Sequence, residues 1–161
     1  MDDDGVPGVS EFGSVDPAPP SSNSDVSSLK RTLLDSEERM FQRMRALFSL
    51  RNIGGEEAID ALCSGFSCHS ALLKHELAYV LGQMQDRQAL PALVNILNDT
   101  QEHVMVRHEA AEAMGAIGST EIESILRKHL DDPNQEISES CEVALDLLQF
   151  SHGPDAANTK W

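Results

Sequence analysis

Apolar residues recur at intervals of three and four along most of the chain between residues 29 and 150, and glycine and proline fall between these runs. This spacing is that of amphipathic helices, whereas the alternation typical of strands is weak and no Asn-Gly turn is present. We therefore predict an all-α fold. To within a few residues, the predicted helices are Glu37–Asn52, Glu56–Gly65, Ala71–Gln85, Ala89–Leu97, His103–Ile117, Thr120–Leu130 and Gln135–Phe150.

Two of these helices repeat each other position by position. The segment Leu73–Met84 aligns with Val106–Ile117, so that apolar residues, a basic residue, a His-Glu pair and a glycine coincide. Less faithful copies, Met44–Leu50 and Glu139–Leu145, lie on either side and lack the His-Glu pair. Helix pairs repeated about four times are typical of an α-solenoid of the HEAT or armadillo kind, in which neighbouring pairs stack to bury their apolar faces.

The composition of the two ends differs from that of the repeated region. Residues 1–28 are acidic and rich in proline, serine and glycine, and residues 151–161 are polar. We predict a flexible, disordered leader over 1–28, a HEAT-like repeat domain over 29–150 and a polar tail over 151–161. Inside the domain, Ser70 and Asp86 are predicted helix N-caps, and Pro91 is expected in a first helical turn.

The charge of the chain argues against nucleic acid as a partner. Its formal net charge is -15, from 27 acidic and 12 basic residues, whereas binding to a phosphate backbone relies on lysine and arginine. The three cysteines form no close pair, which argues for a reducing compartment and against a disulfide scaffold or a four-thiolate zinc site. No apolar run approaches the length of a membrane span, and the acidic start differs from a signal peptide. We therefore expect a cytoplasmic protein with no membrane or nucleic-acid partner.

The repeated His-Glu pairs are the candidate site. In each copy the histidine falls nearly opposite the apolar stripe, and the residues that follow it on that face are small: Ala78 and Gly82 in one helix, Ala111 and Gly115 in the other. Small residues at these positions allow either a neighbouring helix or a metal or ligand to approach. Equivalent helices in a stack lie ~8–10 Å apart, so their imidazoles and carboxylates can converge. Such a mixed nitrogen and oxygen site suits iron, manganese or zinc.

The remaining polar candidates carry weaker signals. We expect solvated or helix-end positions for the histidines without a repeat partner, namely His69, His103, His129 and His152. A solvated acidic face is expected for Glu121, Glu123, Asp131 and Asp132. Cys141 is expected in the core. Met105, next to the second pair, either packs against its neighbours or lines the pocket that a metal faces.

The motifs Ser70–Gln83 and Met105–Ala110, together with the segments 15–20, 51–57 and 140–146, resemble deoxyhypusine hydroxylase, a HEAT-repeat di-iron monooxygenase. The similarity is greatest to the carboxy-terminal half of that enzyme. The resemblance implies hydroxylation of the deoxyhypusine side chain of a translation initiation factor, which completes hypusine with iron and molecular oxygen.

The resemblance also implies a set of site residues. Each half of the family enzyme has two His-Glu pairs and binds one iron through both histidines and the second glutamate. By position, His75, His108 and Glu109 would bind Fe(2+), and Glu76 would face the cationic amine of the substrate, with a further candidate role as a ligand. Met105 joins Glu76 as a candidate substrate-binding residue.

One departure from the family pattern leaves several alternatives open. This chain has two His-Glu pairs where the family enzyme has four, so it provides one iron per chain, and a di-iron centre requires a second half. That half would come from a homodimer or from a complementary half-chain. The competing functions are a non-catalytic HEAT scaffold that binds a basic protein and an inactive truncated product. A structural zinc site is less favoured, because the helices bury their stripes without metal.

Overall fold

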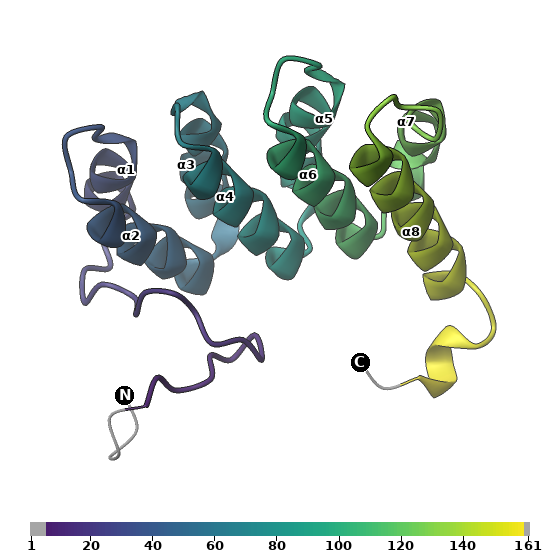
Figure 1. Cartoon of the computed structure of the whole chain (residues 1–161). Coiled ribbons are helices and arrows are strands. Elements are labelled where there is room, and N and C mark those ends of the chain that lie inside the picture. Colours follow the sequence, from purple (N-terminus) through teal and green to yellow (C-terminus); the bar gives the residue numbers. More distant parts are fainter. Residues whose placement is uncertain (1–5, 160–161) are drawn as a thin grey trace. The chain divides into compact units, whose positions relative to one another are not determined.

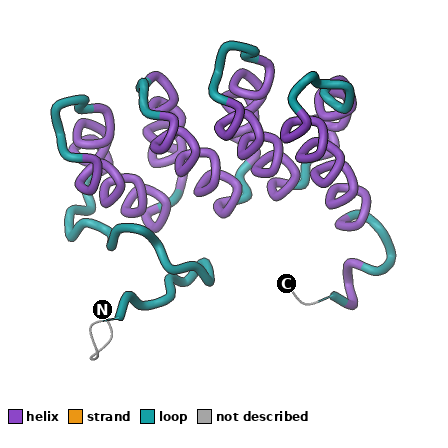
Figure 2. Tube along the Cα trace, viewed as in Figure 1, coloured by secondary structure: helices purple, strands orange, loops and turns teal. Residues whose placement is uncertain are grey.

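The computed structural model describes residues 6–159, and every regular element within this range is a helix (Figures 1 and 2). The eight described α-helices follow one another along the chain as four pairs, which confirms the predicted all-α fold of repeated helical hairpins. Their bounds are α1 (Val26–Leu34), α2 (Met40–Ile53), α3 (Gly55–Ser64), α4 (Ala71–Met84), α5 (Leu90–Asn98), α6 (Val104–Ile117), α7 (Glu123–Lys128) and α8 (Gln135–Ser151). None of the helices described is both long and apolar enough to cross a bilayer.

The chain divides into two compact units, Met1–Gly65 and Phe66–Trp161. In the first unit, α1 packs against both α2 and α3. Its core is apolar and includes Leu29, Leu33, Leu47, Leu50, Ile59 and Leu62. The predicted repeat domain, residues 29–150, includes parts of both units, and its limits stay a prediction.

The leader predicted over residues 1–28 is described from residue 6 onward, and its limits stay a prediction. Residues 1–5 lie outside the described part of the chain, and 6–25 contain no helix. Residues 26–28, by contrast, form the start of α1, where the Asp25 side chain accepts a hydrogen bond from the Ser28 N–H. A further part of the leader has fixed contacts, because Asp16 forms a two-pronged ion pair with buried Arg51, at 3.0 and 2.6 Å.

The second unit contains the two repeated helices. Helices α4, α6 and α8 lie side by side, α5 packs on α6, and α7 packs on α8 (Figure 1). The apolar stripes predicted from the sequence face inward, and the buried residues include Leu73, Leu77, Leu81, Leu93, Leu97, Val106, Met114, Leu126 and Ile137.

The helix ends of this unit follow local chemistry. The Ser70 hydroxyl accepts from the Leu73 N–H at the start of α4, as predicted. Pro91 lies in the first turn of α5, also as predicted, whereas Asp86 caps the short 3-10 helix Arg87–Ala89 that precedes α5. The chain leaves α6 through Gly118 at a φ of 74°, a left-handed conformation that favours glycine.

The predicted helix Thr120–Leu130 corresponds to two shorter elements, whose bounds lie within the few residues that the prediction allowed. The chain forms a 3-10 helix, Thr120–Ile122, before α7, which ends at Lys128. The last two residues of the predicted helix, His129 and Leu130, lie in the turns that lead to α8. There the His129 N–H donates to the Leu126 carbonyl, and the Leu130 N–H donates to the Arg127 carbonyl.

Two glycines allow the three long helices to approach closely. A Cβ added to Gly82 would lie 3.0 Å from the Cα of Ala113, and one added to Gly115 would lie 2.9 Å from the Cα of Ala144. Ala78 and Ala111 are fully buried. Of the two explanations for these small residues, the structure therefore supports helix packing.

Candidate metal centre

The two His-Glu pairs face each other across neighbouring helices. His75 and Glu76 lie in α4, His108 and Glu109 lie in α6, and both pairs are one to two turns from the start of their helix. Because α4 and α6 pack side by side with the glycine contacts near their other ends, the repeated positions come together.

Three donor groups converge at this point. One potential ligand atom each from His75, His108 and Glu109 lies within 4.8 Å of the other two. The Oε2 atom of Glu109 is 3.1 Å from Nε2 of His75 and 3.6 Å from Nε2 of His108. Metal bonds of ~2.0–2.2 Å place adjacent ligand atoms roughly 3 to 3.5 Å apart, so these three residues fit a metal ion. Two imidazoles and one carboxylate suit iron, manganese or zinc.

The electrostatics of Glu109 favour a cation at the same point. The residue is 8% exposed, and desolvation together with the nearby charges of Glu112 and Glu76 raises its pKa from 4.5 to about 7, although His108 opposes this rise. A carboxylate that has lost its water and faces two further acids is stabilised by a positive ion.

Glu76 does not join the three converging donors. Its Oε1 lies 3.9 Å from Nδ1 of His75, and the only group of metal donors found among the described residues is His75, His108 and Glu109. Glu76 nevertheless lies close enough to raise the pKa of Glu109. Its predicted role opposite the substrate amine therefore stays a prediction, and a role as a ligand gains no support from the geometry.

Two hollows adjoin the donor group. Met105, which is 43% exposed, lines a hollow of about 330 Å³ together with His108, Glu112, Glu136, Glu139, Ser140 and Val143. A second hollow of about 420 Å³ reaches Glu109 and Glu112 past Tyr79 and Gly82. Of the two roles considered for Met105, the structure supports lining a pocket beside His108.

The sequence reasoning missed two residues that contact the second histidine. Nδ1 of His108 lies 3.0 Å from the Ser140 hydroxyl and 3.2 Å from Oε1 of Glu112. Glu112 lies one turn after His108 on α6, so its spacing was a usable signal. Ser140 comes from α8, and its place in the last, less faithful copy of the repeat was the only indication.

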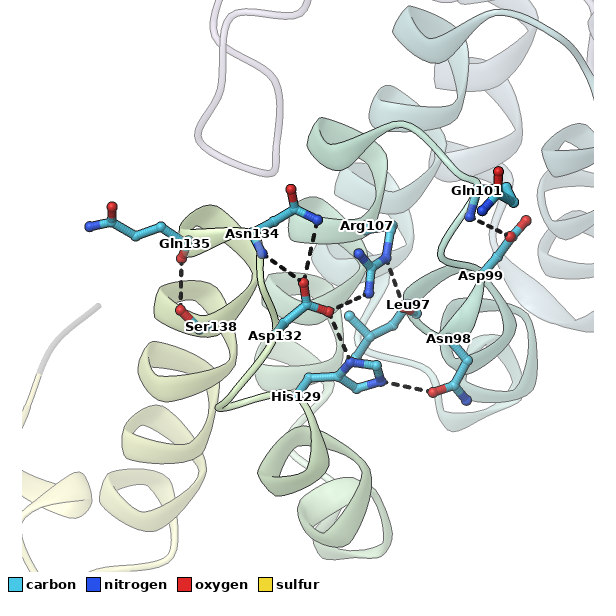
Figure 3. Close-up of polar contacts among 10 residues, drawn as sticks. All are labelled: Leu97, Asn98, Asp99, Gln101, Arg107, His129, Asp132, Asn134, Gln135 and Ser138. Atoms are coloured by element: carbon cyan, nitrogen blue, oxygen red, sulfur yellow. Dashed lines mark hydrogen bonds and ion pairs between the residues drawn. The ribbon is translucent and has the colours of Figure 1, made fainter.

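The environment of Asp132 differs from the one that the sequence predicted. It was predicted on a solvated face, but only 6% of its side chain is exposed, and it accepts a 2.7 Å hydrogen bond from buried Arg107 (Figure 3). Burial disfavours its charge, but the hydrogen bonds from Arg107 and from the Asn134 N–H, together with the Arg107 charge, lower its pKa to about 2. An acid in the loop before α8 thus pairs with the basic residue that precedes His108.

The first copy of the repeat uses the same arrangement. Lys74, which precedes His75, pairs at 2.5 Å with Glu102 in the loop before α6. In both copies the basic residue therefore joins its helix to the loop that leads into the next long helix, which holds neighbouring repeats in register.

The four histidines without a repeat partner take the exposed or helix-end positions that the sequence predicted. His69 is exposed, and His152 bonds the Gly118 carbonyl at 3.0 Å, as expected for a helix end. His103 caps the amino-terminal end of α6 through its ring nitrogen. His129 lies at the carboxy-terminal end of α7, a helix-end position as expected, and its side chain is buried. Its Nε2 lies 2.8 Å from the Asn98 side chain and its Nδ1 lies 3.4 Å from Asp132 (Figure 3). Cys141 is buried, as predicted, and desolvation raises its pKa to about 11.

Comparison with known proteins agrees with the fold of repeated helical hairpins. Residues 66–146 match the HEAT repeat family, and residues 42–68 match the PBS lyase HEAT-like repeat. The deoxyhypusine hydroxylase of Mus musculus is 51% identical over 88% of this chain and 47% of its own length. The corresponding protein of Homo sapiens is 49% identical over 92% of this chain and 49% of its own length.

Solved structures give the same result. The structure of human deoxyhypusine hydroxylase in complex with glycerol has a TM-score of 0.86 and 50% identity, over 90% of this chain and 50% of that one. The CpcE–CpcF phycocyanin lyase complex of Nostoc, at 22% identity and a TM-score of 0.59, shares the fold alone. The chain spans about half the length of the curated relatives it matches. It therefore belongs to the HEAT-repeat family and is similar, over most of its length, to the deoxyhypusine hydroxylases.

Proposed function

We propose that this chain provides one iron-binding half of a deoxyhypusine hydroxylase. The observation that carries the proposal is the convergence of His75, His108 and Glu109, whose donor atoms lie within 4.8 Å of one another. The similarity to deoxyhypusine hydroxylases supports the substrate, which is the deoxyhypusine side chain of a translation initiation factor. That substrate places the reaction in the cytoplasm.

Each site residue has a distinct role in this proposal. His75, His108 and Glu109 would hold Fe(2+), which supplies the activation of molecular oxygen when bound. Glu76 and Glu112 add negative charge beside the donor group, and this charge attracts the protonated amines of the substrate side chain. Met105 lines the hollow next to His108 and offers an apolar contact for the methylene groups between those amines.

The net reaction requires a reductant as well as oxygen. One oxygen atom enters a C–H bond of the side chain to give the alcohol, and the other leaves as water with two protons and two electrons from an external donor. The chain's own residues bind and orient the amine substrate and hold the metal.

The first experiment measures metal binding. Anaerobic titration of the full chain with Fe(2+) should give a stoichiometry near one iron per chain, and His75→Ala, His108→Ala or Glu109→Ala should abolish it or weaken it at least tenfold. His69→Ala is the matched control, because His69 is exposed and lies outside the donor group, and it should bind as the wild type does. Equal binding by all four variants would contradict the proposed site.

The second experiment tests the reaction. The iron-loaded chain, alone and with a complementary half-chain, is incubated with oxygen, a reductant and the deoxyhypusine-bearing factor, and the factor is analysed for a mass gain of one oxygen atom. Product that depends on His75 and His108 supports the proposal. Iron binding without product under every condition would leave a metal-binding HEAT protein and contradict the hydroxylase function.

A further inference from the structure

The two histidines of the donor group differ in the contacts of Nδ1, the ring nitrogen that is not paired with Glu109. Nδ1 of His108 has two oxygen atoms nearby, Ser140 Oγ at 3.0 Å and Glu112 Oε1 at 3.2 Å. Nδ1 of His75 has a Glu76 oxygen at 3.9 Å, which is beyond hydrogen-bond distance. The position of Glu112 in the first copy of the repeat is occupied by Tyr79.

The direction of the hydrogen bonds around His108 follows from which atoms carry hydrogen. The Ser140 hydroxyl lies 3.5 Å from Oε1 of Glu112 and donates to it, because an ionised carboxylate only accepts. The single hydrogen of Ser140 is then used, so its oxygen accepts from the imidazole. These contacts therefore favour the tautomer that carries the ring hydrogen on Nδ1 of His108.

Within residues 6–159, the opposite nitrogen has no competing acceptor at bonding distance. Nε2 of His108 lies 3.6 Å from Oε2 of Glu109, which is longer than both contacts on the Nδ1 side. The neutral ring is thus favoured in the form that has a free lone pair on Nε2, directed toward the carboxylate that would share the metal.

We propose that Ser140 and Glu112 are positioning residues that fix the tautomer and orientation of His108 for metal binding. This inference rests on the proposed metal site and extends it to a third helix, because Ser140 comes from α8. Metal-ligating histidines commonly donate their other ring N–H to a carboxylate or a similar acceptor, and loss of that acceptor lowers metal affinity by roughly 10- to 100-fold. Ser140 is well placed for this role, because it is buried and lies on α8, which approaches α6 closely at Gly115.

The decisive experiment is nitrogen NMR of the metal-free full chain labelled with ¹⁵N-histidine, at about pH 8.5, where ordinary imidazoles are neutral. The His108 signals are identified by their absence in His108→Gln. We expect a protonated Nδ1 and an unprotonated Nε2 in the wild type. In the Glu112→Ala/Ser140→Ala double variant we expect a mixture of the two tautomers. The signals of His75 should not change, which provides an internal control.

The second measurement is Fe(2+) affinity under anaerobic conditions. The double variant should bind roughly 10- to 100-fold more weakly than the wild type, and each single variant should lie between the two. Ser140→Thr, which keeps the hydroxyl, should restore both the tautomer and most of the affinity. The matched controls are Ser138→Ala and Glu139→Gln. Ser138 is a half-buried serine of the same helix whose hydroxyl bonds the Gln135 carbonyl, and Glu139 is an acid of the same hollow that accepts from Gln135 instead of His108.

The two readouts separate this inference from the proposed function. A wild-type His108 with hydrogen on Nε2, or an unchanged tautomer in the double variant, would overturn the positioning role whatever the iron binding. A tautomer that depends on Ser140 and Glu112 in a chain that binds no iron would support the orienting contacts and overturn the metal site. An equal loss of affinity in Ser138→Ala and Ser140→Ala would indicate a general effect on α8 and contradict the inference.

Discussion

Arg107 and Asp132 show how a single buried ion pair connects three segments of the second unit. The Arg107 guanidinium donates to the Leu97 carbonyl at 3.0 Å and to Asp132 at 2.7 Å, and only 2% of its side chain is exposed (Figure 3). Asp132 in turn accepts from the Asn134 N–H at the start of α8. The pair therefore connects the end of α5 and the entry to α8 with α6, where Arg107 directly precedes His108.

Removal of the acid should destabilise the fold. Asp132→Asn leaves the Arg107 charge buried without its partner, so we expect a loss of roughly 3 kcal/mol in the free energy of unfolding at pH 7, measured by urea denaturation. Asp131→Asn removes a neighbouring exposed acid and is the matched control, for which we expect a change within about 0.5 kcal/mol. A similar loss in both variants would argue against a specific pair.

The pH dependence of stability provides an independent check of the same pair. The pKa of Asp132 is lowered from 3.8 to about 2 in the folded chain, so its contribution is fully present above pH 4 and is lost as the pH falls toward 2. The difference in unfolding free energy between the wild type and Asp132→Asn should therefore shrink by about 1–2 kcal/mol between pH 5 and pH 2. A difference that stayed constant over this interval would show that Asp132 is not preferentially ionised in the fold.

At this scale the sequence predicted the residues that repeat but not their partners. His75, His108 and Glu109 were found because the His-Glu pair recurs at matching positions of the two repeats. Asp132 and Ser140 were not, because each acts through a residue 25 or 32 positions away. Only the folded structure shows that Asp132, and not the neighbouring Asp131, pairs with buried Arg107.

At the scale of helices, the distance between α6 and α8 depends on a glycine. A Cβ on Gly115 would come within 2.9 Å of both the Cα and the Cβ of Ala144, so the two helices would have to move apart. That separation would also lengthen the contact between His108 on α6 and Ser140 on α8.

Gly115→Ala should therefore destabilise the chain, although the same change in an open helix stabilises. Glycine to alanine in an unobstructed helix gains roughly 0.5–1 kcal/mol, whereas forced overpacking costs about 1–3 kcal/mol, so the sign of the change in thermal stability is diagnostic. Gly82→Ala meets Ala113 at 3.0 and 3.2 Å and should cost less. A rise in melting temperature in Gly115→Ala would contradict the close approach.

The helices were largely predictable because their apolar stripes are long and regular. The predicted bounds of α4, α6 and α8 agree with the structure to within one residue. Helix α1 was missed because it has few apolar residues, of which Leu29 and Leu33 are the buried ones, and it follows a segment rich in serine and proline. The contacts that stabilise it come from α2 and α3, and no pattern within nine residues reveals them.

At the scale of the whole molecule, the number of metal donors decides what one chain can do. The part of the chain that the structure describes holds one group of three donors, all within the second unit, Phe66–Trp161. The resemblance to deoxyhypusine hydroxylase predicted this group, and the count of two His-Glu pairs where the family enzyme has four led to the expectation that a di-iron centre needs a second half. What the sequence left open was whether the two pairs meet, and their convergence required the close packing of α4 against α6.

A reaction that needs two irons should therefore depend on association with a second half. We expect the iron-loaded monomer to carry one iron and form no hydroxylated product, and product to appear only with a second copy of the chain or with a complementary half-chain. If the second half is another copy, activity per chain should rise with protein concentration, and an excess of His108→Ala chain should suppress the wild type by forming mixed dimers. If it is a different chain, activity should instead saturate as that chain is added. Native mass spectrometry recorded on the assayed samples checks both cases, and full activity in a sample that contains only monomer would contradict the requirement for a second half.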